Sequence, residues 1–137
     1  MRRTLVEGEE EPAIHVSSAA GLVTGAQMGV VEYHIRGTRR DRTDWPDRLV
    51  FDLDPDEEMG FAKVKAAAFQ FRDRLEALGL PTWPVVTGGK GIHVLADLRR
   101  MALWDMVGLF ARTFANLMAA EEPDRYVAVM SKAQRTG

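Results

Sequence analysis

The sequence predicts an α+β domain in which two main helices pack on a mixed or mostly antiparallel sheet. Two long segments repeat apolar residues at three- and four-residue intervals, the period of one face of a helix. Short segments rich in β-branched and aromatic residues alternate with them, and these are typical of strands. With 137 residues, the chain is long enough for one domain, residues 1–137. The mixed order of elements leaves an α/β arrangement open.

The N-terminal part predicts a short helix followed by a strand. Residues 1–13 are polar and acidic, which indicates a loose lead-in. A helix is predicted from Ser17 or Ser18 toward Met28, because serine is a favourable N-cap residue. The β-branched and aromatic residues 30–35 then predict a strand.

The middle of the chain predicts a loop, a strand and the first long helix. Residues 37–47 are charged and predict a loop, and residues 48–54 predict a strand that Pro55 ends. The helix follows, and Gly79 stands where a C-terminal cap glycine belongs. Its apolar face comprises Phe61, Val64, Ala68, Phe71, Leu75 and Leu78.

The last part predicts two strands around a turn, a second helix and a final strand. Residues 83–87 indicate a short extended segment, residues 88–91 a turn, and residues 92–96 a strand. The second helix is predicted over residues 102–120, and a last strand over residues 126–130. The apolar face of this helix comprises Leu103, Val107, Phe110, Phe114 and Leu117.

Composition and charge exclude several classes of protein. The chain has no cysteine, which excludes disulfides and thiolate metal sites, and it has no apolar segment of membrane-spanning length. We therefore expect a cytoplasmic protein without a membrane partner. The formal net charge is −2, so binding to nucleic acid would depend on local basic clusters, each of which is by itself more typical of a solvated loop. These clusters are Arg36, Arg39, Arg40 and Arg42, and the pair Arg99 and Arg100.

The first motif with chemical character is Asp52-Leu53-Asp54, at the end of the strand predicted over residues 48–54. Side chains two positions apart on a strand lie on the same face, so these two carboxylates could share Mg²⁺ or Mn²⁺, which prefer oxygen ligands. An acidic turn after a strand is the plainer interpretation. The spacing excludes an EF-hand, because Glu57 occupies the position at which that loop needs glycine.

The second motif runs from Thr87 to His93 and contains three glycines around Lys90. The glycines let backbone N–H groups approach an anion, and the lysine adds a positive charge. The motif differs from a Walker A loop, because no serine or threonine follows the lysine and a strand comes next. His93 opens that strand and could donate to a phosphate. A glycine-rich hairpin turn is the alternative.

The third motif is Glu32 and His34, which would share one face of the strand predicted over residues 30–35. A carboxylate beside a histidine can fix its tautomer or raise its pKa, although a solvated strand face is an equally good interpretation. Together the three motifs provide an acidic pair, a loop that suits phosphates and two histidines. These are the groups that transfer of a nucleotidyl or phosphoryl group requires.

In order and spacing, these motifs resemble the polymerase domain of bacterial ATP-dependent DNA ligase D, of the archaeo-eukaryotic primase superfamily. The Phe-Asp-Leu-Asp-Pro and Gly-Gly-Lys-Gly-x-His blocks are specific when both occur in one chain. The resemblance runs from about Gly21 to Gly137 and implies a partial primase-polymerase core. It implies addition of nucleotides, often ribonucleotides, to DNA ends in non-homologous end joining. The segments that carry it are residues 31–34, 45–55, 78–80, 87–94, 123–126 and 131–135.

The resemblance also implies roles for individual residues. Asp52 and Asp54 would be catalytic and would hold Mn²⁺ or Mg²⁺, and His34 would help to position the nucleotide. The implied partners are DNA primer-templates, NTP or dNTP, Ku and a ligase chain, in the nucleoid region of a bacterial cytoplasm. Further candidates for contacts to nucleic acid or phosphate are Arg36, Lys132 and Arg135. The implied triphosphate-binding residues are Thr87, Gly88, Gly89, Lys90 and His93.

The resemblance further implies that the core is incomplete at both ends. The family places a third metal carboxylate on a strand that would follow residues 132–137, and its N-terminal portion meets template DNA. We therefore expect this chain to be too truncated for full activity alone. The main alternative is a non-catalytic module that binds NTP and metal, or a partner, and that could form homo-oligomers through an exposed sheet edge. A haloacid-dehalogenase-type phosphatase is less favoured, because Asp56 replaces the Thr or Val of its motif.

Overall fold

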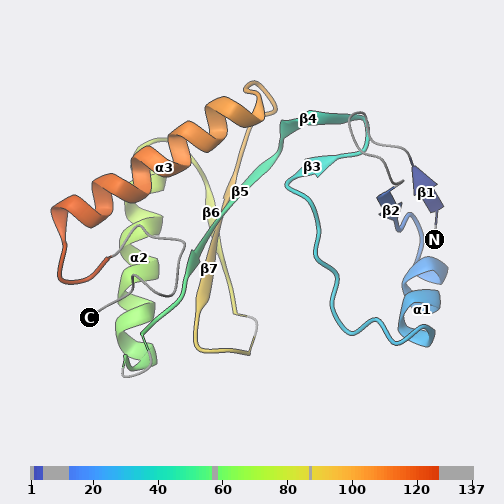
Figure 1. Cartoon of the computed structure of the whole chain (residues 1–137), viewed down its shortest axis with the longest axis horizontal. Helices are drawn as coiled ribbons and strands as arrows, with labels where there is room; N and C mark the ends of the chain where they lie inside the picture. The colour runs from blue at the N-terminus through green and yellow to red at the C-terminus, as the bar shows by residue number, and fades with distance from the viewer. Residues whose placement is uncertain (1, 5–12, 57–58, 87, 127–137) are drawn as a thin grey trace.

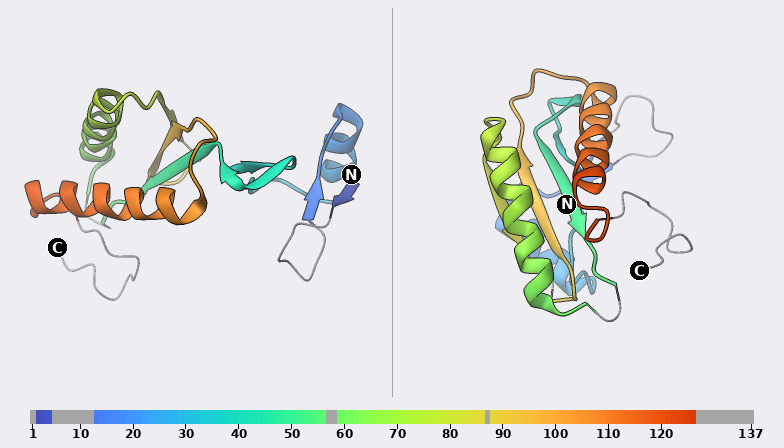
Figure 2. Two further views of the ribbon diagram at one scale, coloured as in Figure 1. Left: turned by 90° about the horizontal axis from the view of Figure 1, so that it is seen from above. Right: turned by 90° about the vertical axis from the view of Figure 1, so that its left-hand side faces the viewer.

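The computed structural model describes residues 2–4, 13–56, 59–86 and 88–126. This part of the chain forms three helices and three separate antiparallel sheets, which confirms the α+β class (Figure 1). Strands β1 (Arg2–Thr4) and β2 (Ala13–His15) pair near helix α1 (Ala19–Gln27), so part of the expected loose lead-in is a strand pair. This N-terminal unit lies at the end of the molecule opposite the two long helices (Figure 2).

A three-stranded antiparallel sheet forms the centre of the fold. Its spatial order is β5 (Arg48–Leu53), β7 (Ile92–Asp97) and β6 (Thr82–Val85), close to the ranges predicted from the sequence. Alternation along β7 gives the sheet two different faces. The side chains of residues 92, 94 and 96 are buried, whereas those of residues 93 and 95 lie partly exposed on the other face.

Helices α2 (Phe61–Ala77) and α3 (Trp104–Glu121) cover the buried face of this sheet. The contact is largely aromatic. The Phe51 ring of β5 lies 5.5 Å from the Phe71 ring of α2 and 5.2 Å from the Phe114 ring of α3, measured between centroids. Such tilted and edge-to-face pairs add to the stabilisation from burial. The core comprises Phe51, Phe71, Leu75, Val94, Ala96, Phe114 and Met118.

Local caps end α2 and start α1. Gly79 has a φ of +78°, and the N–H groups of Gly79 and Leu80 donate back to the carbonyls of Glu76 and Leu75. This arrangement closes the last turn of α2 and confirms the predicted cap at Gly79. Helix α1 starts as predicted, since the Ser18 Oγ accepts from the N–H of Gly21 at 3.2 Å.

The predicted apolar faces of the helices are correct in the middle and wrong at the ends. Phe61, which starts α2, and Leu78, which follows its last residue, are 50% and 60% exposed. Leu103, just before α3, and Leu117, in its C-terminal part, are 47% and 50% exposed. On α3, Met118 is buried in place of the neighbouring leucine.

The strand predicted over residues 30–35 is wrong, because these residues form an irregular linker. The Val30 N–H donates to the Gly25 carbonyl and so completes the end of α1. Val31 is fully exposed and Ile35 is 69% exposed. Strand propensity depends on a partner strand and on burial, and the described part of the chain supplies neither here.

The loop predicted over residues 37–47 is also wrong, because it contains the hairpin β3 (Thr38–Arg39) and β4 (Arg42–Pro46). Its charged sequence lacks the apolar alternation that usually marks a strand. The strand predicted over residues 126–130 lies almost wholly outside the described residues. None of the described helices is long and apolar enough to cross a membrane.

Candidate active site

Asp52 and His93 form a pair on the exposed face of the central sheet. They are register partners on β5 and β7, and the Asp52 Oδ1 lies 3.3 Å from the His93 Nε2. The Asp52 side chain is 65% exposed and the His93 side chain 35% exposed. Their strand neighbours Phe51 and Val94 are buried in the core, so the pair faces away from the helices. The antiparallel register thus joins two of the motifs found in the sequence.

Asp54 lies one residue beyond the end of β5 and is exposed. The described residues contain no group of three or more His, Cys, Asp or Glu side chains placed to hold a metal ion. Two exposed carboxylates nevertheless suit Mg²⁺ or Mn²⁺, because such ions commonly take one or two protein carboxylates and complete their coordination with phosphates and water. Asp52 and Asp54 are therefore candidate oxygen ligands for such an ion.

The glycine-rich turn joins β6 to β7 next to this pair. Gly88 has a φ of +87°, a conformation that glycine adopts without strain, and Gly89 and Lys90 are exposed. Thr87 lies outside the described residues. Lys90 stands three residues before His93, so its charge belongs to the same end of the sheet as the Asp52 carboxylate.

Gly91 belongs to the predicted glycine-rich motif, but the sequence reasoning gave it no separate role beside Asp52. A Cβ at this position would lie 2.9 Å from the Leu53 carbonyl oxygen and 3.7 Å from the Asp52 Oδ1. The turn therefore packs directly against the backbone between the two aspartates. A glycine immediately before a strand was the available signal, because it often marks close approach of another backbone.

The exposed face around Asp52 and His93 has an apolar floor, which the sequence did not distinguish from the core. Val50, Trp83 and Val85 are 45%, 49% and 39% exposed. The register pairs Val50 and Trp83 with Leu95, and Val85 with His93, so these side chains share one face. Apolar area beside a pair of polar side chains is typical of a surface that a ligand covers.

His34 and Glu32 lie in the linker between α1 and the hairpin, apart from any strand. The His34 Nε2 is 3.9 Å from the Glu32 Oε2, and the two side chains are 89% and 63% exposed. Among the described residues, Glu32 is the polar partner of the His34 ring, so the structure does not join His34 to the Asp52–His93 pair. Arg36 is exposed in the same linker, whereas Lys132 and Arg135 lie outside the described residues.

Asp47 fixes the start of β5, the strand that carries Asp52. It is buried, and its carboxylate accepts from the Arg39 Nε at 2.8 Å and from the Arg48 Nε at 3.2 Å. Burial raises the pKa of Asp47, but the bonds from the two arginines outweigh it and hold the pKa below its ordinary value. The Asp47 N–H also donates to the Gly37 carbonyl, and its carbonyl accepts from the Leu98 N–H. A buried charged carboxylate therefore ties the hairpin to the sheet.

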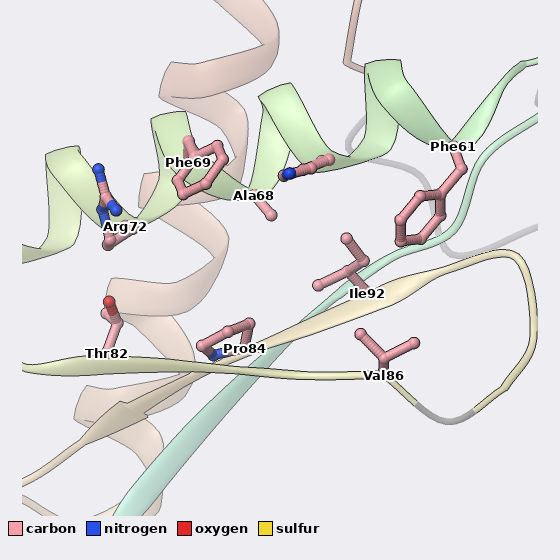
Figure 3. A pocket seen from close by; sticks show the side chains of 9 residues that line it. Phe61, Ala68, Phe69, Arg72, Thr82, Pro84, Val86 and Ile92 are labelled. Carbon is pink, nitrogen blue, oxygen red and sulfur yellow. The ribbon is translucent and has the colours of Figure 1, made fainter.

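A separate cavity of about 340 Å³ lies between α2 and β6 (Figure 3). Ile92 lines it, whereas the adjacent His93 lies on the other face of β7. The cavity is thus on the helix-covered side of the sheet, away from the Asp52–His93 pair. Its lining consists of Phe61, Lys65, Ala68, Phe69, Arg72, Thr82, Pro84, Val86 and Ile92.

Known proteins resemble this chain in both sequence and structure. The family model of the LigD primase-polymerase domain matches residues 2–137, so the likeness begins earlier than the expected start near Gly21. The multifunctional non-homologous end joining protein LigD of Pseudomonas aeruginosa is 35% identical over 126 residues, which are 92% of this chain and 15% of that protein. The LigD protein of Mycobacterium tuberculosis is 31% identical over 130 residues, covering 89% of this chain and 17% of its own length.

A solved structure agrees with this result. The polymerase domain of Mycobacterium tuberculosis ligase D, determined in complex with DNA, superposes with a TM-score of 0.84 at 29% identity. The match covers 99% of this chain and 51% of that chain. The chain therefore spans about half of that polymerase domain and a smaller share of the curated relatives. By sequence and by fold, it belongs to the LigD primase-polymerase domain family.

Proposed function

We propose that this chain forms the metal- and triphosphate-binding part of a nucleotidyltransferase that adds nucleotides, often ribonucleotides, to DNA ends in non-homologous end joining. The observation that carries the proposal is the pairing of Asp52 with His93 at 3.3 Å, beside the glycine-rich turn. Membership of the LigD polymerase family supports the same reaction class. The names of the relatives support a role in end joining. Ku and a ligase are the further partners that we propose.

In this proposal each part of the site has a distinct task. Asp52 and Asp54 would hold Mn²⁺ or Mg²⁺, which neutralises charge on the reacting phosphates. Backbone N–H groups of residues 88–91 and the Lys90 ammonium group would bind the triphosphate. His93 would orient the Asp52 carboxylate and, when protonated, would add positive charge beside the phosphates.

The apolar floor gives the nucleoside a surface to cover. Trp83 and Val85 are exposed on the same face as His93, and an aromatic face accepts any nucleobase by stacking. Stacking requires no base-specific contact. Template-directed addition demands such a site, because the template and not the protein selects the base. The DNA in the related polymerase structure supports DNA as the second substrate.

Primer extension tests the proposal. We would incubate the chain with a duplex that has a 5′ overhang, Mn²⁺ and either NTPs or dNTPs, and compare Asp52→Asn and Asp54→Asn with the wild type. Asp73→Asn is a matched control, because it removes an exposed carboxylate on α2, away from the sheet face. We expect loss of extension in the first two variants and wild-type extension in the control.

A binding measurement separates the proposed enzyme from the non-catalytic alternative. Mn²⁺-dependent NTP binding that Asp52→Asn abolishes, without extension by the wild type, would favour a nucleotide-binding module. Absence of both extension and NTP binding would refute the proposed function. The family assignment does not favour a haloacid-dehalogenase-type phosphatase.

A further inference from the structure

The fold brings the two arginine-rich segments of the sequence together. Arg100, in the loop after β7, donates from both terminal nitrogens to the Asp41 carboxylate at the tip of the hairpin, at 2.8 and 3.0 Å. The Trp104 Nε1, at the start of α3, donates to the Thr43 carbonyl of β4 at 2.9 Å. We name residues 36–48 and 97–100 the arginine ridge. It contains seven arginines and four aspartates, a net charge of +3, whereas the whole chain carries −2.

Some of these arginines hold the ridge together. Arg39 and Arg48 are bonded to the buried Asp47, and Arg100 is bonded to Asp41. Their charges are balanced locally by those carboxylates. They fix the position of the hairpin relative to the sheet, so the remaining cations lie on a supported surface.

Three other arginines are exposed and have no carboxylate partner among the described residues. The Arg42 guanidinium lies over the Trp45 ring, 4.4 Å from its centroid, and the Arg42 residue is exposed. The Arg40 Nη1 is 3.3 Å from the His15 Nε2, a contact with an imidazole nitrogen rather than a carboxylate. The Arg99 side chain is exposed and makes no polar contact within the described part of the chain. Uncompensated guanidinium groups of this kind suit phosphate oxygens.

The ridge lies at one end of β5 and the Asp52–His93 pair lies toward the other. Figure 1 shows the hairpin continuing into β5 at the end of the strand opposite to the glycine-rich turn. Arg48 and Asp52 share the exposed face of β5, because they are four positions apart. Arg42 precedes Asp52 by ten residues, so an extended backbone separates them by at most about 33 Å, the length of about ten base pairs of DNA.

We propose that the arginine ridge binds the phosphate backbone of a DNA duplex whose end lies at Asp52, within about one helical turn of that end. This inference rests on the proposed function and adds to it a binding surface outside the site of chemistry. The contacts are to phosphate, so they give affinity without sequence preference. Arg40, Arg42 and Arg99 are the residues that make them.

Equilibrium DNA binding by Arg40→Gln/Arg99→Gln tests the proposal. The matched control is Lys63→Gln/Lys65→Gln on α2, which removes the same charge from an exposed face distant from the ridge. Fluorescence anisotropy is measured over a salt series with hairpin-capped duplexes of about 6 and about 20 base pairs. For the ridge variant we expect weaker binding of the long duplex only, and a slope of log K against log salt reduced by up to about 1.8. Arg99→Gln alone, which breaks no polar contact, should give about half of this change.

The outcomes separate this inference from the proposed function. Three results would refute the ridge proposal. They are an equal loss of DNA affinity in both double variants, a loss independent of duplex length, and an unchanged slope of log K against log salt. A wild-type chain that binds Mn²⁺ and NTP but no DNA would also refute the ridge proposal. That result would leave the proposed triphosphate site unaffected. A ridge-specific effect in a chain without primer extension supports the ridge and counts against catalysis.

Discussion

Replacing Gly91 by alanine tests whether close packing of the glycine-rich turn sets the position of the Asp52 carboxylate. The added Cβ would lie 2.9 Å from the Leu53 carbonyl oxygen, a backbone atom between the two aspartates. Carbon and oxygen atoms in proteins normally approach to about 3.3 Å, so the turn and the end of β5 must separate by about 0.4 Å. Both aspartates are attached to the segment that has to move.

The expected effect is measurable both in function and in stability. A displacement of 1 Å at a reacting group costs on the order of 100-fold in rate, so about 0.4 Å should cost about six-fold if the cost scales with distance. Overpacking should also lower the free energy of unfolding by about 1 kcal/mol. The assays are primer extension, Mn²⁺-dependent NTP affinity and denaturant unfolding.

Gly108→Ala is the matched control for Gly91→Ala. Gly108 lies within α3, and the nearest atom to its added Cβ is the Arg112 Nη1 at 3.5 Å, the far end of a flexible side chain. Alanine should leave NTP affinity unchanged there and stabilise the helix by about 0.5–1 kcal/mol. Wild-type affinity and stability in Gly91→Ala, or an equal functional loss in Gly108→Ala, would refute the reasoning about the turn.

Two further predictions concern the attachment of the hairpin to the sheet. Asp47→Ala should lower the free energy of unfolding by about 2 kcal/mol, because it removes a buried hydrogen-bond acceptor. We assign most of this loss to the bond with the half-buried Arg48, because the Arg39 side chain is largely exposed. The pKa of Asp47 in the folded state is lowered, so its contribution to stability is fully present above its ordinary pKa of 3.8. This contribution is lost as the pH falls through the folded pKa. The free energies of unfolding of wild type and variant, measured by urea titration, should therefore converge only below about pH 4. Gly37→Ala should also destabilise the chain, because its Cβ would meet the Arg48 carbonyl oxygen at 2.9 Å and the Trp104 ring at 3.2 Å, and equal melting temperatures by circular dichroism would contradict this.

The central sheet and the two long helices could be predicted because their sequence patterns report burial. Phe71 and Leu75 recur at helical spacing and are both buried, and Gly79 ends α2 as its sequence indicates. Strands β5 and β7 consist of apolar residues bounded by turn residues. In each case a local pattern and the packing of the whole fold favour the same structure.

The hairpin and the linker before it could not be predicted, because long-range contacts decide their structure. Val31 and Ile35 have strand propensity, yet no described strand lies beside them. The hairpin has little apolar pattern, and its supports are the Asp47 carboxylate and the bond from the Trp104 indole. The same charged residues that suggested a loop are therefore those that hold the hairpin in place.

The sequence indicated single motifs of the candidate site but not the surface between them. The sequence indicated Asp52 and His93 separately, and only the antiparallel register brings them to 3.3 Å. Val50 and Phe51 are adjacent apolar residues on β5, yet Phe51 is 8% exposed and Val50 45% exposed. A strand that is apolar on both sides normally indicates a sheet covered on both faces. Here helices cover one face of the described structure, so the apolar residues of the other face are available to a ligand, which is consistent with a nucleotide lying across the sheet between Trp83 and the Asp52 carboxylate.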